Sequence, residues 1–315
     1  MTSMRFGLQT SINGVGWAEL EDMWKFLDRE TNFYSAWTFD HFVPPGVGQD
    51  PSGSCFEGWS SLAALAAVTE RIRLGCLVTG VTYREPAVLA KMAATVDHIS
   101  NGRLEFGIGA AWHEAEHRMY GIPFPPVKER QDRLEEAVQL IRMLFDAEGP
   151  VNFAGTHYEL REAVFAPQCV QRPHPPIMIG GGGEKRTLRT LARYGDVMNV
   201  SGDPAAVKAK IAILERHCAE VGRDPAAIDK TVFTAVIVSE NEKLIDRVAT
   251  MLSAGTGMSA EQAKQALPIG SAAHVREVVE RYADIGVTQI IMMAQAPWKR
   301  DIYQRLNEEI VVPFA

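Results

Sequence analysis

Two adjacent residues, Asp40 and His41, stand at the end of the apolar run 35–42 and could form a small proton-transfer site. A carboxylate beside an imidazole offers one ligand a hydrogen-bond acceptor, a donor and a group that titrates near neutral pH. The alternative is that Asp40 caps its loop and His41 only packs. We treat the pair as a candidate catalytic site.

Four consecutive glycines, Gly180–Gly183, follow the apolar run Ile177–Ile179 and precede Lys185 and Arg186. At a junction between a strand and a helix, free N–H groups and the positive end of the helix dipole can bind a phosphate. The run lacks the GK[ST] ending of a P-loop and the early position of a Rossmann fingerprint. A flexible turn is the alternative, but four glycines in a row favour a phosphate site.

The segment His113–His117 reads HEAEH and matches the HExxH pattern of zinc metalloproteases. On a helix, the two histidines would share one face, and Glu135 or Glu136 could be a third ligand. However, the segment directly follows a glycine-rich apolar run, and no third histidine of the metzincin type follows it. We therefore predict no metal site and keep a zinc hydrolase as an alternative only.

Alternating apolar runs and amphipathic stripes must position these residues. Apolar runs that alternate with helical stripes are typical of a parallel sheet covered by helices. We predict eight strands, at residues 4–10, 35–42, 72–79, 104–108, 177–179, 197–200, 231–238 and 289–293. Eight strand–helix units in about 300 residues favour a (β/α)8 TIM barrel, with a doubly wound sheet as the alternative. In a barrel, the active site lies where the strands end.

Two segments interrupt the alternation. Residues 149–176 are rich in proline, glycine and aromatic residues, and we expect a lid or excursion there, before the fifth strand, with the substrate beneath it. Residues 242–270 predict a helical hairpin near the mouth of the site. The prediction is one barrel domain that spans residues 1–315.

Composition limits the partners and the compartment. The chain has 315 residues, is 46% hydrophobic and 23% charged, and carries a formal net charge of -7, which argues against a nucleic-acid or anionic membrane surface. Its four cysteines form no CxxC pair, and no apolar run is long enough to span a membrane. We expect a cytoplasmic protein that acts on a small molecule.

Taken in order, the Asp40–His41 pair, the Leu77–Thr79 run, the segment Gly107–Glu116 and the loop Ile179–Thr187 resemble the bacterial luciferase-like oxidoreductase superfamily. The glycine loop resembles the branch that uses the deazaflavin coenzyme F420, whereas other branches use reduced FMN. This resemblance implies a TIM barrel with an insertion before strand five, a homodimer, and a cofactor ring at the mouth of the barrel.

The resemblance also assigns roles to residues. It implies that His41 is catalytic, near the hydride-carrying carbon. It implies a non-prolyl cis peptide at Cys76–Leu77 against the ring face. The residues that it implies for cofactor binding are Asp40, Cys76, Leu77, Thr79, Ala110, Ala111, His113, Gly180, Gly181, Gly182 and Gly183.

One departure from the family concerns Trp112, which stands where deazaflavin-dependent sugar-phosphate dehydrogenases carry a catalytic glutamate. We therefore expect an apolar or aromatic substrate rather than a sugar phosphate. The leading hypothesis is hydride transfer between F420 and a small organic substrate. The alternatives are a flavin monooxygenase that uses reduced FMN, and a barrel that carries or senses such a cofactor without turnover.

Overall fold

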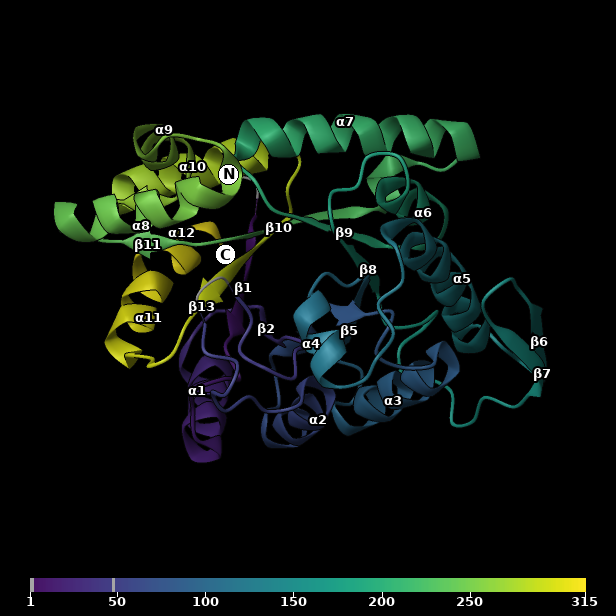
Figure 1. Ribbon diagram of the computed structural model, residues 1–315. Helices are drawn as coiled ribbons and strands as arrows, with labels where there is room; N and C mark the ends of the chain where they lie inside the picture. Colours follow the sequence, from purple (N-terminus) through teal and green to yellow (C-terminus); the bar gives the residue numbers. More distant parts are fainter. Residues whose placement is uncertain (1–2, 47–48) are drawn as a thin grey trace.

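Parallel strands form a closed barrel in the computed structural model, which describes residues 3–46 and 49–315 (Figure 1). The strand order is β3-β2-β1-β13-β10-β9-β8-β5-β4, and a further pairing of β3 with β5 closes the ring. The barrel strands are β1 (Arg5–Thr10), β2 (Ser35–Thr38), β3 (Arg73–Cys76), β4 (Thr79–Gly80), β5 (Leu104–Gly109), β8 (Ile177–Gly180), β9 (Val197–Val200), β10 (Asp229–Thr234) and β13 (Gln289–Ala294). Because β3 and β4 are two parts of one strand, the ring has eight positions, and the predicted (β/α)8 fold is confirmed.

Helices surround this ring, and the longer ones cover the outer faces of its strands, whereas the short helix 114–119 lies at the mouth of the barrel (Figure 1). They are α1 (Trp17–Glu30), α2 (Gly58–Val68), α3 (Pro86–Ile99), α4 (Glu114–Met119), α5 (Val127–Phe145), α6 (Thr187–Tyr194), α7 (Pro204–Val221), α8 (Glu242–Thr256), α9 (Ala260–Ala266), α10 (Ala272–Asp284), α11 (Arg300–Leu306) and α12 (Val312–Phe314), with short turns η1 (Pro225–Ala227) and η2 (Asn307–Val311). The local sequence explains several helix starts. Pro86 and Pro204 occupy the first turns of α3 and α7, where a missing N–H costs little. No helix within the described ranges is long and apolar enough to cross a bilayer.

The inside of the barrel has its own apolar core, because alternate residues of each strand point inward. Trp37, Leu77, Met178, Val197 and Ile291 form this buried cluster. Glycine makes room for the largest of them: a Cβ on Gly75 would lie 2.4 Å from the Trp37 ring. The strands are therefore buried on both faces, which explains their continuous apolar sequences.

Several predicted boundaries were wrong. The second strand ends at Thr38 rather than Phe42, so Asp40 and His41 lie in the loop beyond it. The predicted strand 231–238 is two elements, because β10 ends at Thr234 and β11 (Ile237–Val238) pairs with β12 (Ile269–Gly270) outside the barrel. Between β11 and β12 lie the helices α8 and α9, in the segment where we predicted a helical hairpin.

The segment 149–176 precedes β8, the fifth strand position, as predicted, but it does not cover the carboxyl ends of the strands. Its hairpin of β6 (Val151–Ala154) and β7 (Glu159–Ala163) lies outside α5 at the edge of the molecule (Figure 1). Farther along, the Gln171 amide donates to the Leu104 carbonyl at the start of β5, 2.8 Å away, and to Asp97 at the end of α3, 2.7 Å away. These contacts fix the segment at the amino ends of the strands, so the predicted lid over the substrate is wrong.

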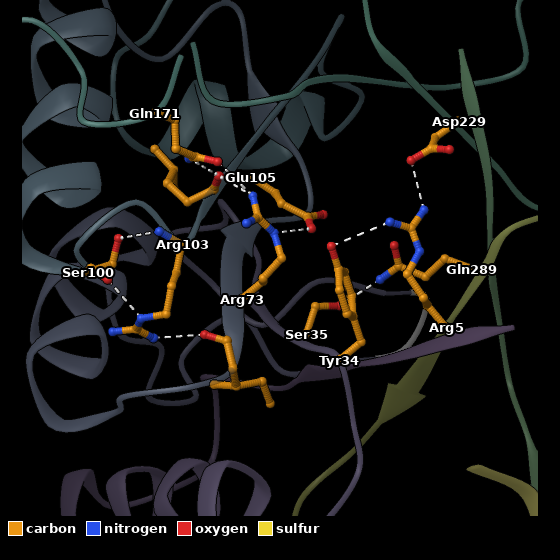
Figure 2. A network of polar contacts seen from close by, with 12 residues as sticks. Arg5, Tyr34, Ser35, Arg73, Ser100, Arg103, Glu105, Gln171, Asp229 and Gln289 are labelled. Atoms are coloured by element: carbon orange, nitrogen blue, oxygen red, sulfur yellow. Dashed lines mark hydrogen bonds and ion pairs between the residues drawn. The ribbon is translucent and has the colours of Figure 1, made fainter. Parts of the chain in front are cut away.

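A network of polar side chains lies at the same amino end of the barrel (Figure 2). Arg5 pairs with Asp229 at 2.7 Å, and Arg73 pairs with Glu105 at 2.8 Å. Arg73 also donates to Gln171 at 2.9 Å. Burial raises the pKa of Glu105 and the Arg73 guanidinium opposes that shift. This network links strands that are far apart in sequence.

Candidate active site

A groove opens at the carboxyl ends of β2, β4, β5 and β8 and has a volume of about 360 Å³. Eight of the eleven residues predicted to bind a cofactor line it, together with His41. The eight are Asp40, Leu77, Thr79, Ala110, Ala111, Gly180, Gly181 and Gly183. The barrel topology thus brings together residues that are up to 143 positions apart, since Asp40 and Gly183 share one groove.

The other three predicted residues, Cys76, His113 and Gly182, do not line the groove. Cys76 belongs to the outer core, and burial raises the pKa of its thiol well above the usual range. The non-prolyl cis peptide is at Leu77–Val78, one residue after the predicted Cys76–Leu77 bond. Cys76 is the last residue of β3 and pairs with Thr38. The cis peptide therefore lies in the interruption between β3 and β4, which begins after Cys76.

The histidines of the HExxH segment make contacts with neighbouring protein groups. His113 is the residue before α4 and stacks on Trp112, with ring centroids 4.9 Å apart. His117 is buried, with Nε2 2.6 Å from the Thr82 hydroxyl and Nδ1 2.8 Å from the His113 carbonyl. Across residues 3–46 and 49–315, no three His, Cys, Asp or Glu side chains are grouped to hold a metal.

The glycine loop forms one wall of the groove and is held tightly. A Cβ on Gly180 would lie 2.7 Å from Val78 Cγ2, and Gly181 has a φ of 119°, which strains any other residue. The Gly181 N–H donates to the Asn199 carbonyl at 3.0 Å, so it is not free for a phosphate as predicted. The Gly182 and Gly183 N–H groups have no acceptor among the described residues. Helix α6 begins at Thr187 rather than at Glu184, so these two donors lie just before its start.

His41 is positioned by a buried carboxylate, Glu116 on α4. The Nδ1 atom lies 3.1 Å from Glu116 Oε1, and the Glu116 side chain is fully buried. The Tyr83 hydroxyl donates to the same oxygen, while the Phe42 and Val43 N–H groups donate to Oε2 at 2.6 and 3.2 Å. One carboxylate therefore accepts four hydrogen bonds from two loops.

This hydrogen bonding fixes the charge of Glu116 and the tautomer of His41. Burial by itself raises the pKa of Glu116, but the hydrogen bonds from His41, Tyr83 and the Phe42 N–H outweigh it and lower the pKa to about 2. An ionised carboxylate can only accept, so Nδ1 of His41 must carry a proton. The other ring nitrogen, Nε2, has no hydrogen-bond partner in the described chain and is the atom left for a ligand.

Asp40, beside His41, is fully buried and forms a two-pronged ion pair with Arg84. The Arg84 nitrogens lie 2.7 and 3.0 Å from the two carboxylate oxygens, and Arg84 also donates to Glu57. Burial raises the pKa of Asp40, and the Arg84 charge opposes that shift. Asp40 thus lies in the groove wall as a carboxyl group that Arg84 holds in place.

A second chamber of about 650 Å³ adjoins the groove and shares His41, Leu77 and Trp112 with it. The Trp112 ring lies edge-on to His41, with centroids 5.2 Å apart, and is 61% exposed. His41 therefore stands between two neighbouring cavities, as a site that joins a cofactor and a substrate requires. A further cavity of about 600 Å³ lies beside the segment 164–173, and none of the predicted site residues line it.

Sequence reasoning missed the roles of Glu116 and Tyr83. Glu116 belongs to the HExxH pattern and to the segment Gly107–Glu116, but its partners Tyr83 and His41 are 33 and 75 residues away along the chain. Arg84 follows the Leu77–Thr79 run by five residues, and nothing in the sequence around it indicates Asp40 as its partner. Such pairs are set by tertiary structure, and no local spacing signals them.

Comparisons with known proteins agree with this geometry. A family model described as luciferase-like monooxygenase matches residues 4–289. An F420-dependent glucose-6-phosphate dehydrogenase from Amycolatopsis mediterranei is 35% identical over 196 residues, which are 61% of this chain and 56% of that protein. A pyrimidine monooxygenase from Allorhizobium ampelinum is 31% identical over 211 residues, or 65% and 55% of the two chains. These alignments span little more than half of each curated relative.

Among solved structures, an F420-dependent secondary alcohol dehydrogenase in complex with an F420-acetone adduct superposes with a TM-score of 0.82. The superposition covers 98% of this chain and 99% of the other, at 20% sequence identity. At that identity, the likeness shows a common fold.

Proposed function

The chain belongs to the luciferase-like monooxygenase family, and from this premise we propose that it is an oxidoreductase that transfers a hydride between coenzyme F420 and a small, apolar or aromatic organic substrate. The observation that carries the proposal is the position of His41, whose ring lines both the glycine-walled groove and the adjoining chamber. F420-dependent proteins among the relatives and the fold neighbours support the choice of cofactor.

The residues of the groove fit a flavin-type cofactor. A volume of about 360 Å³ is within the range of ligand pockets, and the small residues Gly80, Gly109 and Ala110 allow a flat ring to approach the backbone. The unpaired Gly182 and Gly183 N–H groups near the start of α6 offer donors for a phosphate. When bound, the deazaflavin supplies the hydride donor or acceptor.

The chain itself supplies orientation and a proton. With Nδ1 held by Glu116, His41 presents Nε2 to the two cavities and can give a proton to a substrate oxygen, or take one from it. Reduction then adds a hydride to carbon and a proton to oxygen, and oxidation removes both. The Trp112 ring lies edge-on to His41 and forms part of the wall of both cavities.

An anaerobic absorbance titration of the purified protein with F420 and, separately, with FMN tests the cofactor. We expect micromolar binding of F420. Micromolar binding of FMN with no binding of F420 would instead support the flavin monooxygenase alternative, which a pyrimidine monooxygenase among the relatives also favours.

The variant His41→Asn tests the proton-transfer role. It should keep cofactor affinity and lose at least 100-fold in turnover, because general acid–base groups contribute about 10²- to 10⁴-fold. His113→Asn is the matched control, since that ring lies 5.7 Å from His41 but does not line the groove. Equal turnover in the two variants would contradict the role of His41.

A further inference from the structure

We infer that the 650 Å³ chamber selects an uncharged substrate with a carbonyl or hydroxyl group on an apolar body, and that the side-chain amide of Gln9 is the specificity-determining group that binds this oxygen. The inference rests on the proposed function and deepens it by naming the substrate class. Three observations carry it: the position of the chamber, the charge of its walls, and an unpaired amide at its base.

The chamber is next to the cofactor groove and to the free nitrogen of His41. Leu77, Trp112 and His41 line both cavities, so a molecule in the chamber lies against the same side chains as a ring in the groove. Its other walls come from the ends of β1, β10 and β13 and from the loop after β2. A substrate there can meet both the ring and His41 Nε2.

The walls contain apolar and neutral polar groups but no fixed charge. Within the described chain, no Lys, Arg, Asp or Glu side chain lines the chamber. The apolar lining side chains are Phe39, Pro45, Leu77, Trp112, Phe233, Met251, Met293 and Ala296. A carboxylate or phosphate would lose its hydration without gaining a counter-charge, which is costly. The chamber therefore disfavours the sugar phosphate of the Amycolatopsis relative and favours a neutral molecule.

Gln9 is the one buried residue among the four that bring side-chain amides to the described lining of the chamber, the others being Asn13, Gln49 and Gln295. It lies on β1, two residues after Gly7, whose position beside Trp37 and Gln289 shows that this face of the strand points into the barrel. The residue as a whole is 9% exposed, and its amide, which has no hydrogen-bond partner in residues 3–46 or 49–315, opens onto the chamber. Its neighbour Ser11 differs, because its hydroxyl already accepts the Ala296 N–H at 3.0 Å.

An amide that no protein group pairs and that faces an open chamber is free to hydrogen-bond a ligand in place of water. The amide NH₂ can donate to a carbonyl oxygen, and the amide oxygen can accept from a hydroxyl. Gln9 can therefore bind the substrate oxygen before and after hydride transfer, whereas a positive residue would favour an anion. The choice of an amide suits a reaction that interconverts a ketone and an alcohol.

The test compares two ketones that differ in charge, 4-methylcyclohexanone and 4-oxocyclohexanecarboxylate, with reduced F420 as co-substrate. Initial rates are followed by cofactor absorbance. We expect kcat/KM for the neutral ketone to exceed that for the acid by at least 10-fold. Equal or greater turnover of the acid would overturn the inference, and so would failure of the protein to bind or turn over either ketone.

Gln9→Leu removes the amide with little change in volume, and the exposed Gln304→Leu on α11 is the matched control. Gln9→Leu should lower kcat/KM for the neutral ketone about 10-fold or more without changing F420 affinity, because a ligand oxygen loses its partner. Gln9→Glu should lower it further. Unchanged kcat/KM in Gln9→Leu would refute the role of Gln9.

Binding of each ketone to the protein alone, measured by saturation-transfer NMR, separates this inference from the proposed function. If F420 does not bind, the proposed function fails. The chamber assignment then still stands if the neutral ketone binds, the acid does not, and Gln9→Leu abolishes the signal. If F420 binds and this preference is absent, only the inference fails.

Discussion

Glu116→Gln is the most informative single substitution, because it keeps the shape of the buried carboxylate and removes its charge. The backbone N–H groups of Phe42 and Val43 cannot change direction, so the one remaining amide oxygen must face them. The new NH₂ group then faces His41 and Tyr83. His41 Nδ1 must accept rather than donate, and in the neutral ring the proton moves to Nε2.

The magnitude of the stability loss follows from the pKa of Glu116. A shift from 4.5 to about 2 corresponds to about 3.4 kcal/mol of stability at 1.36 kcal/mol per pH unit. Because the folded-state pKa is lowered, this stability is fully present above pH 4.5 and is lost as the pH falls through 2. By the linkage relation, about 1.4 kcal/mol of this stabilisation by Glu116 remains at pH 3. The wild type should therefore exceed Glu116→Gln in free energy of unfolding by about 2 kcal/mol less at pH 3 than at pH 7.

Urea unfolding at pH 7 and pH 3 measures this difference, and ¹⁵N NMR of the histidine rings reports the tautomer. Glu114→Gln is the matched control, since that side chain is exposed on the same helix. Alcohol oxidation should also slow, because neutral His41 would present a donor at Nε2, where this direction needs an acceptor. The reasoning would be refuted if Glu116→Gln were as stable as Glu114→Gln at pH 7, or if Nδ1 of His41 stayed protonated in the neutral ring.

Three further outcomes are expected. Gly180→Ala should weaken F420 binding at least 10-fold in absorbance titrations, because its Cβ would lie 2.7 Å from Val78 and displace the groove wall. Gly149→Ala is the control and should leave F420 binding unchanged, because a Cβ there has no neighbour within 4 Å. Arg84→Met should lower the free energy of unfolding by about 3–5 kcal/mol, because it leaves Asp40 buried and unpaired. The double variant Arg84→Met/Asp40→Asn should recover most of this loss. An Arg84→Met variant as stable as the wild type would contradict the ion-pair assignment. Light scattering should give twice the chain mass of 34.7 kDa, as the family resemblance implies, and a monomer mass would contradict the predicted homodimer.

The barrel and the location of its mouth could be predicted because both follow from local sequence. Strands buried on both faces give short apolar runs, and parallel strands bring their carboxyl ends to one edge. Asp40, Ala110 and Gly180 follow three different runs and line one groove. Their convergence needed no knowledge of side-chain contacts.

The tertiary pairings could not be predicted in the same way. Nothing near Glu116 in sequence shows that its oxygens hold the loop after β2, and nothing near Gly181 shows that its N–H is taken by Asn199. The composition of residues 149–176 suggested a lid, but composition does not tell which end of the barrel a loop packs against. The contact of Gln171 with the start of β5 decides that question.

The ion pairs at the amino end of the barrel have a consequence for how such a protein can diversify. Arg5, Arg73 and Glu105 join strands through contacts that none of the groove or chamber residues share. Mutations in the loops at the mouth can then change which substrate binds, while the ion pairs at the amino end of the barrel keep the strands in register. Selection for a new substrate and selection for a stable barrel therefore act on different residues.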